Sequence, residues 1–240
     1  MNFGVSTFLW VSPFDNQSLD LVAKVKEMGF DLIEIPVEKK ELINWEKLRS
    51  TIQDAGLKVT ISGAFGADRD ISSEDPATRK NGLQYIKDCT EIASYMGSPL
   101  FGGPLYSAVG KTRFISEEQK KKEREWCVSN LVEAAKFAQD QGIILGLEPL
   151  NRFESDMVNT ADQALSLTRE VDSPNLKIQL DTSIAILRKR IFRTLSVKSE
   201  KTCYAMCRAM KVTGVPRAPV IWIARASKPP FMKLVMKELW

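Results

Sequence analysis

Hydrophobic and polar positions follow two alternating periodicities along the first three quarters of the chain. Short apolar runs, typical of buried strands, alternate with longer segments in which apolar residues recur every three to four positions, as on one face of an α-helix. The predicted strands are 3–6, 31–36, 58–62, 99–102, 143–147 and 176–181, and the predicted helices are 19–28, 45–55, 76–96, 116–141 and 160–171. Glycine follows four of these helices, at the position where it commonly ends a helix.

Strands that alternate with helices predict an α/β fold with a parallel sheet and right-handed crossovers. The expected fold class is a (β/α)8 TIM-barrel type that is incomplete, with about six β/α units and an irregular C-terminal tail. An open, doubly wound sheet satisfies the same periodicity, but no Gly-x-Gly-x-x-Gly follows a predicted strand. The length of 240 residues suits one such domain. We therefore expect a partial barrel over 1–182 and a separate tail over 183–240.

Charge is unevenly distributed between these two parts. Residues 182–240 contain 13 of the 34 Lys and Arg residues but only two of the 30 acidic ones, Glu200 and Glu238. A basic tail is typical of a nucleic-acid-binding arm. Such arms interleave aromatic residues with the basic ones, and between residues 196 and 225 only Tyr204 and Trp222 intervene. We expect no nucleic-acid partner, and binding through the tail stays as an alternative.

Several classes of protein are excluded or disfavoured by composition. The chain has no histidine, which excludes Ser-His-Asp catalysis and any His-ligated metal within it. The four cysteines form no paired framework and are expected to be reduced. The N-terminus lacks a basic region followed by an apolar one, and no apolar run reaches the roughly 18 residues of a membrane span. These features predict a cytoplasmic protein without a membrane partner.

Two acidic residues stand where predicted strands end. Glu148 follows the strand 143–147, and Asp181 ends the strand 176–181. The C-terminal ends of barrel strands carry the chemistry of β/α-barrel enzymes, so both residues are candidates for a catalytic site. Acids at such positions are also common as helix N-caps or surface charges, and position alone does not decide between these roles.

Three stretches of the sequence resemble motifs of a known group of enzymes and occur in the same order as in that group. They are Gly-Pro-Leu-Tyr-Ser at 103–107, Leu-Glu-Pro-Leu-Asn-Arg-Phe-Glu at 147–154 and Leu-Asp-Thr at 180–182. Together they resemble the xylose isomerase-like TIM-barrel sugar isomerases and epimerases, in particular the D-tagatose/D-psicose (allulose) 3-epimerases. The resemblance covers residues 1–182. It implies a ketose 3-epimerase or isomerase that acts on a small-molecule sugar, and family members are often homo-oligomers.

The resemblance also implies roles for individual residues. Family members hold one divalent metal, Mn²⁺, Co²⁺ or Mg²⁺, with a Glu, an Asp, a His and a second Glu. Glu148 matches the first of these ligands and Asp181 the second. Glu154 matches a glutamate that contacts sugar hydroxyls, and Tyr106 is a further substrate-binding candidate. The implied reaction removes a proton next to a carbonyl, forms an enediolate and returns a proton from the opposite face, with Glu148 as a catalytic carboxylate.

Directly after Thr182 the resemblance ends, and the genetic code offers an explanation. If one base is lost at codons 182–183, each original codon is the last base of one present codon plus the first two of the next. Ser183-Ile184 can then derive from codons for the expected Phe-His, and residues 206–211 can restore His-Val-Gln-Gly-Asn-Glu. Residues 213–220 can restore Asp-Arg-Gly-Thr-Pro-Gly-Thr-Gly. The shift splits the histidine codons and turns GAG and GAA into basic codons, so the tail is expected to be frameshifted.

A frameshifted tail predicts an enzyme that is impaired. The chain keeps Glu148 and Asp181 but lacks the His ligand, the second Glu and two strands. One alternative is a catalytically inactive barrel fragment. An endonuclease IV-like enzyme, which shares the fold, needs a His-rich zinc cluster that this chain cannot provide.

Overall fold

A ring of β-strands occupies the centre of the molecule, for which we describe a computed structural model. The structure describes residues 2–179, 203–208 and 221–224. The strands are β1 (Asn2–Ser6), β2 (Leu32–Val37), β3 (Lys58–Gly63), β4 (Leu100–Gly103), β5 (Ile144–Leu147), β6 (Leu176–Gln179), β7 (Cys203–Arg208) and β8 (Ile221–Ala224). The helices are α1 (Asp20–Glu27), α2 (Trp45–Asp54), α3 (Pro76–Met96), α4 (Glu117–Asp140) and α5 (Ala161–Val171). Four single-turn 3₁₀ helices lie at Thr7–Leu9, Asn16–Ser18, Lys40–Leu42 and Ala67–Arg69.

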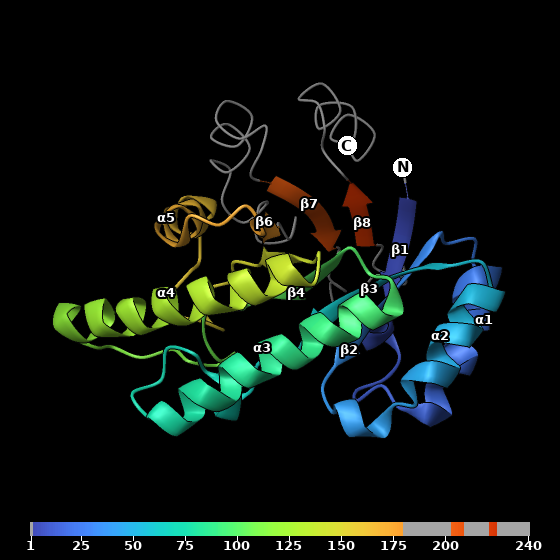
Figure 1. The fold of residues 1–240 in the computed structure, drawn as a ribbon, viewed down its shortest axis with the longest axis horizontal. Helices are drawn as coiled ribbons and strands as arrows, with labels where there is room; N and C mark the ends of the chain where they lie inside the picture. The colour runs from blue at the N-terminus through green and yellow to red at the C-terminus, as the bar shows by residue number, and fades with distance from the viewer. Residues whose placement is uncertain (1, 180–202, 209–220, 225–240) are drawn as a thin grey trace.

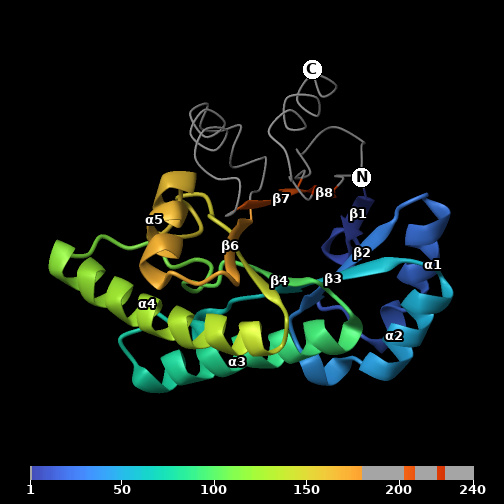
Figure 2. The same ribbon diagram turned by 45° about the horizontal axis from the view of Figure 1, so that its top comes forward.

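Strands β1 to β6 pair in sequence order, and each pair is parallel. The five helices lie outside this row of strands, with α3 and α4 side by side along one flank and α1 and α2 together at one end (Figures 1 and 2). The fold class predicted from the sequence, a TIM-barrel type with about six parallel strands, is confirmed. The predicted ends agree within one residue, except that 180 and 181 of the sixth strand lie outside the described residues.

Local sequence signals explain where the helices begin and end. Asn44, Asp75, Ser116 and Thr160 each precede a helix and accept a hydrogen bond from a backbone N–H of its first turn. These bonds satisfy donors that have no partner within the helix itself. Gly97 follows α3 with a φ of 75°, a left-handed conformation that glycine adopts without a steric cost.

The strands present different residues to their two sides. The side that faces the helices is apolar and forms the hydrophobic core with helix residues; it includes Val5, Ile33, Ile35, Val59, Ile61, Phe101, Leu145, Leu147 and Ile178. Successive residues of a strand point to opposite sides, so the alternate positions face the inside of the barrel. Toward the C-terminal ends of the strands these inward residues are small or polar: Ser6, Glu34, Thr60, Ser62, Gly102, Gly146 and Gln179. Nearer the N-terminal ends, Leu32 and Leu100 are apolar.

Two strands, β7 and β8, lie in the segment for which irregular structure was expected. β7 pairs in parallel with β6, whereas β8 runs antiparallel to both β7 and β1 and closes the ring. The expectation of a tail without strands is therefore wrong for these two segments. Free sheet edges offer backbone donors and acceptors, which another strand can satisfy whatever its side-chain pattern. Neither strand belongs to a β/α unit among the described residues, and the rest of the predicted tail, from 183, lies outside them.

In the part of the chain that the structure describes, no helix is both long enough and apolar enough to cross a membrane.

The start of α5 provides a test of the local signals. The Thr160 hydroxyl accepts a hydrogen bond from the Gln163 N–H at 3.1 Å, and the Gln163 side chain accepts one from the Thr160 N–H at 3.1 Å. We expect Thr160→Ala to lower the free energy of unfolding by about 1 kcal/mol, because the Gln163 N–H has no acceptor within the helix and would lose the Thr160 hydroxyl. Urea denaturation measures this change. Thr160→Ser should retain the wild-type stability, and equal stability of the Ala variant would contradict the assignment of this cap.

Candidate active site at the barrel mouth

The predicted catalytic carboxylate lies at the C-terminal end of β5. Glu148 follows Leu147 directly and is only 2% exposed. Its backbone N–H donates to the Gly103 carbonyl at 2.9 Å, which extends the pairing of β4 with β5 by one residue. Its Oε2 accepts a hydrogen bond from Nε2 of Gln179, on the neighbouring strand β6, at 3.3 Å. A buried carboxylate is thus held at the end of the barrel where this fold carries its chemistry.

Tyr106 supports the loop that contains Glu148. Its ring is fully buried, its hydroxyl donates to the Val158 carbonyl at 2.9 Å, and it accepts from the Leu150 N–H at 3.1 Å. Burial is the main cause that raises the pKa of this phenol, so the group stays protonated. The two bonds tie the loop after β4 to both ends of the loop after β5. The substrate contact predicted for Tyr106 stays a prediction.

The other two predicted site residues have different positions. Glu154 is partly exposed in the loop after β5, where its side chain accepts a hydrogen bond from the Asn151 amide and its carbonyl accepts one from the Gly110 N–H. Its predicted contact with sugar hydroxyls stays a prediction. Asp181 lies outside the described residues. Of the predicted acids, the described residues therefore bring Glu148 alone to the inside of the barrel.

Sequence reasoning missed Gln179, which lies beside Glu148. It is 3% exposed on the inward side of β6, and its amide oxygen has no hydrogen-bond partner among the described residues. The hydroxyls of Thr60 and Ser62, on the inward side of β3, also lack a partner there. Buried polar groups are usually satisfied, so such exceptions mark a functional compromise or a place for a polar ligand. The one available signal was a glutamine in a strand that is otherwise mostly apolar.

A cluster of five charged residues joins the loops around the barrel mouth, and we call it the charged cluster: Asp70, Lys111, Arg113, Glu123 and Asp156. Lys111 Nζ lies 2.7 Å from Asp70 Oδ2 and 3.0 Å from Glu123 Oε2. The Arg113 guanidinium makes two hydrogen bonds to Glu123, at 3.0 and 2.7 Å, and a third to Asp156 at 3.1 Å. The cluster connects the loops after β3, β4 and β5 with α4.

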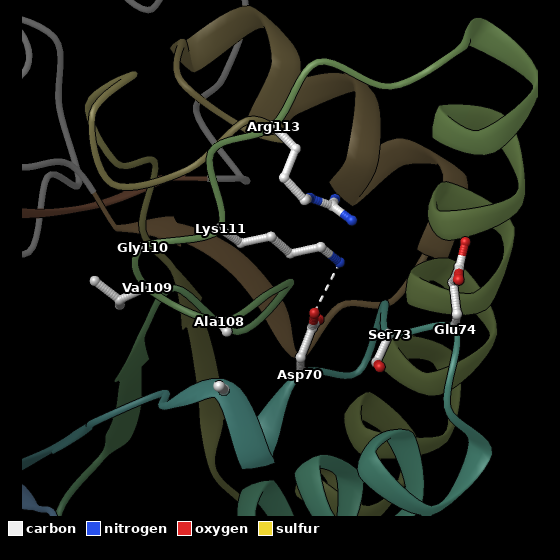
Figure 3. Close-up of a pocket in the computed structure, with 9 residues that line it drawn as sticks. Asp70, Ser73, Glu74, Ala108, Val109, Gly110, Lys111 and Arg113 are labelled. Carbon is white, nitrogen blue, oxygen red and sulfur yellow. Dashed lines mark hydrogen bonds and ion pairs between the residues drawn. The ribbon is translucent and has the colours of Figure 1, made fainter.

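The charged cluster borders a pocket of about 400 Å³ between the loops that follow β3 and β4. Lys111 extends from the second loop toward Asp70 of the first, and Arg113 extends above it from the same loop (Figure 3). Both cations already have acidic partners, so the pocket offers no free positive charge to an anionic ligand. Glu148 and Gln179 are not among the residues that line it. We therefore assign the pocket to the support of the mouth and not to the reaction.

Hydrogen bonds within the charged cluster favour the charged forms of Glu123 and Arg113. Burial is the largest influence on Glu123 and acts to raise its pKa. Hydrogen bonds from Arg113, Lys111 and Gln119 favour the charged form and together outweigh burial, which lowers the pKa of Glu123 to about 2. The hydrogen bonds that Arg113 donates to Glu123 also raise the pKa of Arg113 above its usual range. The cluster is therefore a set of fixed ion pairs.

The described residues do not fit the divalent metal that the sequence resemblance implies. Among them, no group of three or more His, Cys, Asp or Glu side chains is arranged to hold a metal ion. Glu148 has the Gln179 amide beside it, and the chain has no histidine to complete a ligand set. Oxygen-ligated divalent metals need more ligands than this one carboxylate supplies.

The fold and the site together define a β/α-barrel protein with a buried carboxylate at the C-terminal end of its strands. The profile of the family described as "Xylose isomerase-like TIM barrel" matches residues 22–193, which is more than half of the chain. The chain belongs to this family.

Relatives of this chain are sugar epimerases. It is 31% identical over 183 residues to a ketose 3-epimerase of Arthrobacter globiformis, a match that covers 76% of this chain and 62% of that protein. It is 31% identical over 187 residues to a D-psicose 3-epimerase of Ruminiclostridium cellulolyticum, over 76% of this chain and 63% of that protein. The chain thus spans less than two thirds of the length of these relatives. By family it groups with sugar epimerases and isomerases.

A solved structure agrees with this grouping. The structure described as D-psicose 3-epimerase with D-tagatose from Clostridium cellulolyticum H10 superposes with a TM-score of 0.76 at 26% identity, over 90% of this chain and 77% of that chain. A D-allulose 3-epimerase structure from Methylomonas sp. reaches a TM-score of 0.82 at 23% identity, over 98% of this chain and 83% of that chain, and supports the fold alone.

Removal of Lys111 tests the charged cluster. We expect Lys111→Met to lower the free energy of unfolding by about 3–5 kcal/mol, because Asp70 and Glu123 lose the cation that they share while they stay buried. Lys120→Met is a matched control: Lys120 pairs with Glu117 on the exposed surface of α4, and its loss should cost about 1 kcal/mol or less. Denaturant unfolding compares the two variants. Equal losses would show that the buried pairs add no more than surface ones.

Acid titration tests the ionisation of Glu123. Its pKa is lowered in the folded protein, so its contribution to stability is fully present above the ordinary value of 4.5 and is lost as the pH falls toward about 2. We expect the wild type to lose more stability across this window than Glu123→Gln, by up to about 3 kcal/mol. Unfolding curves at several pH values measure the difference. Parallel pH profiles for the two proteins would contradict the assigned pKa.

Proposed function

We propose that this chain derives from a ketose 3-epimerase or isomerase, and that in its present form the activity is impaired. The observation that carries the proposal is Glu148, a buried carboxylate at the C-terminal end of β5. Two features support a sugar as the ligand. The inward side of the barrel is polar near the C-terminal ends of the strands, where the hydroxyls of Thr60 and Ser62 have no partner among the described residues, and the relatives are named as ketose epimerases. A ligand with several hydroxyl groups suits such a lining.

Glu148 is proposed as the base of the reaction. Epimerisation at C3 of a ketose breaks the C3–H bond next to the carbonyl, gives an enediolate and returns a proton to the opposite face. A buried carboxylate can take this proton, and burial keeps water away from the enediolate. The return from the opposite face needs a second acid. We propose that this acid is the second Glu of the family, which the chain lacks after residue 182, and that its loss is the chemical reason for the impairment.

The divalent metal of the proposed ancestor has two candidate ligands in this chain, Glu148 and Asp181. We derive no step through it, because the described residues do not assemble a metal site. We expect weak metal binding at most. Glu154 and Tyr106 keep their proposed roles beside the substrate.

The impairment has a proposed genetic cause. A single-base shift at codons 182–183 accounts at once for the absent histidines, the basic composition of residues 183–240 and the antiparallel direction of β8. The last point follows because the original family fold has parallel strands throughout. We propose that residues 1–182 are the family domain and that residues 183–240 are translated out of frame.

We also propose that the partner of this chain is a small-molecule sugar and that it has no nucleic-acid or membrane partner. Its proposed location is the cytoplasm. By analogy with family members, the proposed assembly is a homo-oligomer. A second candidate function is that of a catalytically inactive barrel fragment, which the lack of a metal-binding group among the described residues favours.

The function is tested by comparing the present chain with a version whose frame is restored by one base at codon 183. The assay is C3 epimerisation of D-fructose, D-tagatose and D-allulose with Mn²⁺ added, followed by chromatography of the sugars. We expect the present chain to show little or no turnover. The restored chain should gain activity and Mn²⁺ binding, and Glu148→Gln should abolish the gained activity.

Each of two outcomes would contradict a different part of the proposal. Turnover by the present chain that is as fast as in the restored one, and that Glu148→Gln abolishes, would contradict the impairment. A restored chain that folds but converts none of the three ketoses and binds no Mn²⁺ would contradict both the frameshift and the assigned activity.

A further inference from the structure

We propose that Gln179 is a positioning residue of the active site, which holds the Glu148 carboxylate in its reactive orientation. This inference rests on the proposed function, in which Glu148 is the base. Gln179 extends from the inward side of β6, and its Nε2 donates to Glu148 Oε2 at 3.3 Å. Both side chains are almost fully buried, at 3% and 2% exposure, so water does not compete for this bond.

Two glycines on neighbouring strands make room for the Gln179 side chain. Gly102 of β4 pairs in register with Gly146 of β5. A Cβ atom at Gly102 would lie 1.8 Å from Gln179 Oε1 and 2.9 Å from Gln179 Cδ. A Cβ atom at Gly146 would lie 2.8 Å from the same oxygen and 3.3 Å from Gln179 Cβ. Real Cβ atoms do not approach other atoms so closely, so any larger residue at Gly102 would displace the amide.

The orientation of the amide follows from the charge beside it. Its oxygen faces the two glycines and has no hydrogen-bond partner among the described residues. A flipped amide would place this oxygen against the Glu148 carboxylate, and two acceptors with no hydrogen between them repel each other. The observed orientation leaves a buried acceptor unsatisfied in order to give the carboxylate a donor. Proteins retain such a loss of stability mainly at functional sites, where it orients a reacting group.

The first test measures the environment of the Glu148 carboxyl group. In protein labelled with ¹³C at the glutamate carboxyl carbon, Glu148→Gln identifies the Glu148 resonance. We expect Gln179→Met, which keeps the length and removes the donor, to shift this resonance by more than its line width. Gln84→Met is the matched control, because Gln84 makes the same kind of bond, 2.8 Å to Asp88, on the exposed surface of α3. It should leave the resonance in place.

The second test is a double-mutant cycle on the contact between Gly102 and the Gln179 side chain. Gly102→Ala should lower the melting temperature and shift the Glu148 resonance as Gln179→Met does. Gln179→Ala removes the atoms that the new Cβ meets, so Gly102→Ala should cost markedly less in a Gln179→Ala background. Gly146→Ala, with the milder overlap, should give a smaller loss than Gly102→Ala. If Gly102→Ala alone does not fold, a folded double variant demonstrates the same coupling.

The outcomes separate this inference from the proposed function. An unshifted Glu148 resonance in Gln179→Met, or equal losses from Gly102→Ala with and without Gln179, would overturn the positioning role. Titration of the wild type with D-tagatose tests the function: we expect the sugar to move the Glu148 resonance, and to move it at least severalfold less effectively in Gln179→Met. A further outcome is a Glu148 resonance that differs between wild type and Gln179→Met and yet stays unchanged when D-tagatose, D-fructose or D-allulose is added to the wild type. That result would support the positioning role and overturn the assigned substrate.

Discussion

The alternation of side chains along β5 and β6 is the constraint on which the site depends. Leu147 and Ile178 face the helices and belong to the hydrophobic core, so their neighbours Glu148 and Gln179 face the inside of the barrel. A shift of either strand by one residue would move its polar residue into the core and its apolar residue to the inside. The burial of two leucine-sized side chains therefore fixes the position of the carboxylate and its amide partner.

The same constraint explains which parts of the structure could be predicted from the sequence. The strands and helices up to residue 179 follow from periodicity, proline and glycine signals, because core packing and local propensity agree there. The burial of Glu148 at the end of a strand could be predicted because this acid belongs to a longer motif that follows an apolar run; its position after a strand alone would not have decided it. The position of Gln179 could not be predicted, since a single glutamine in a strand has the same appearance in a sequence whether it faces solvent or a carboxylate.

The charged cluster and the last two strands were missed for a different reason. Lys111 and Asp70 are 41 residues apart in sequence, and both lie in loops, where no periodicity indicates which residues meet. The pairing of β7 and β8 with β6 and β1 depends on backbone groups of sheet edges, which every sequence carries. Predictions from composition therefore describe the tail as irregular, although two of its segments complete the ring.

The described contacts that support Glu148 lie within residues 1–179. The charged cluster, the Tyr106 hydroxyl and the Gln179 amide all come from this part, and they tie the loops after β3, β4 and β5 to one another. The proposed change of frame after codon 182 would thus leave the carboxylate and its described surroundings in place, while it would remove every histidine that the original frame would supply. Under this proposal, loss of catalytic groups and loss of the fold are separable, because a barrel distributes them over different strands.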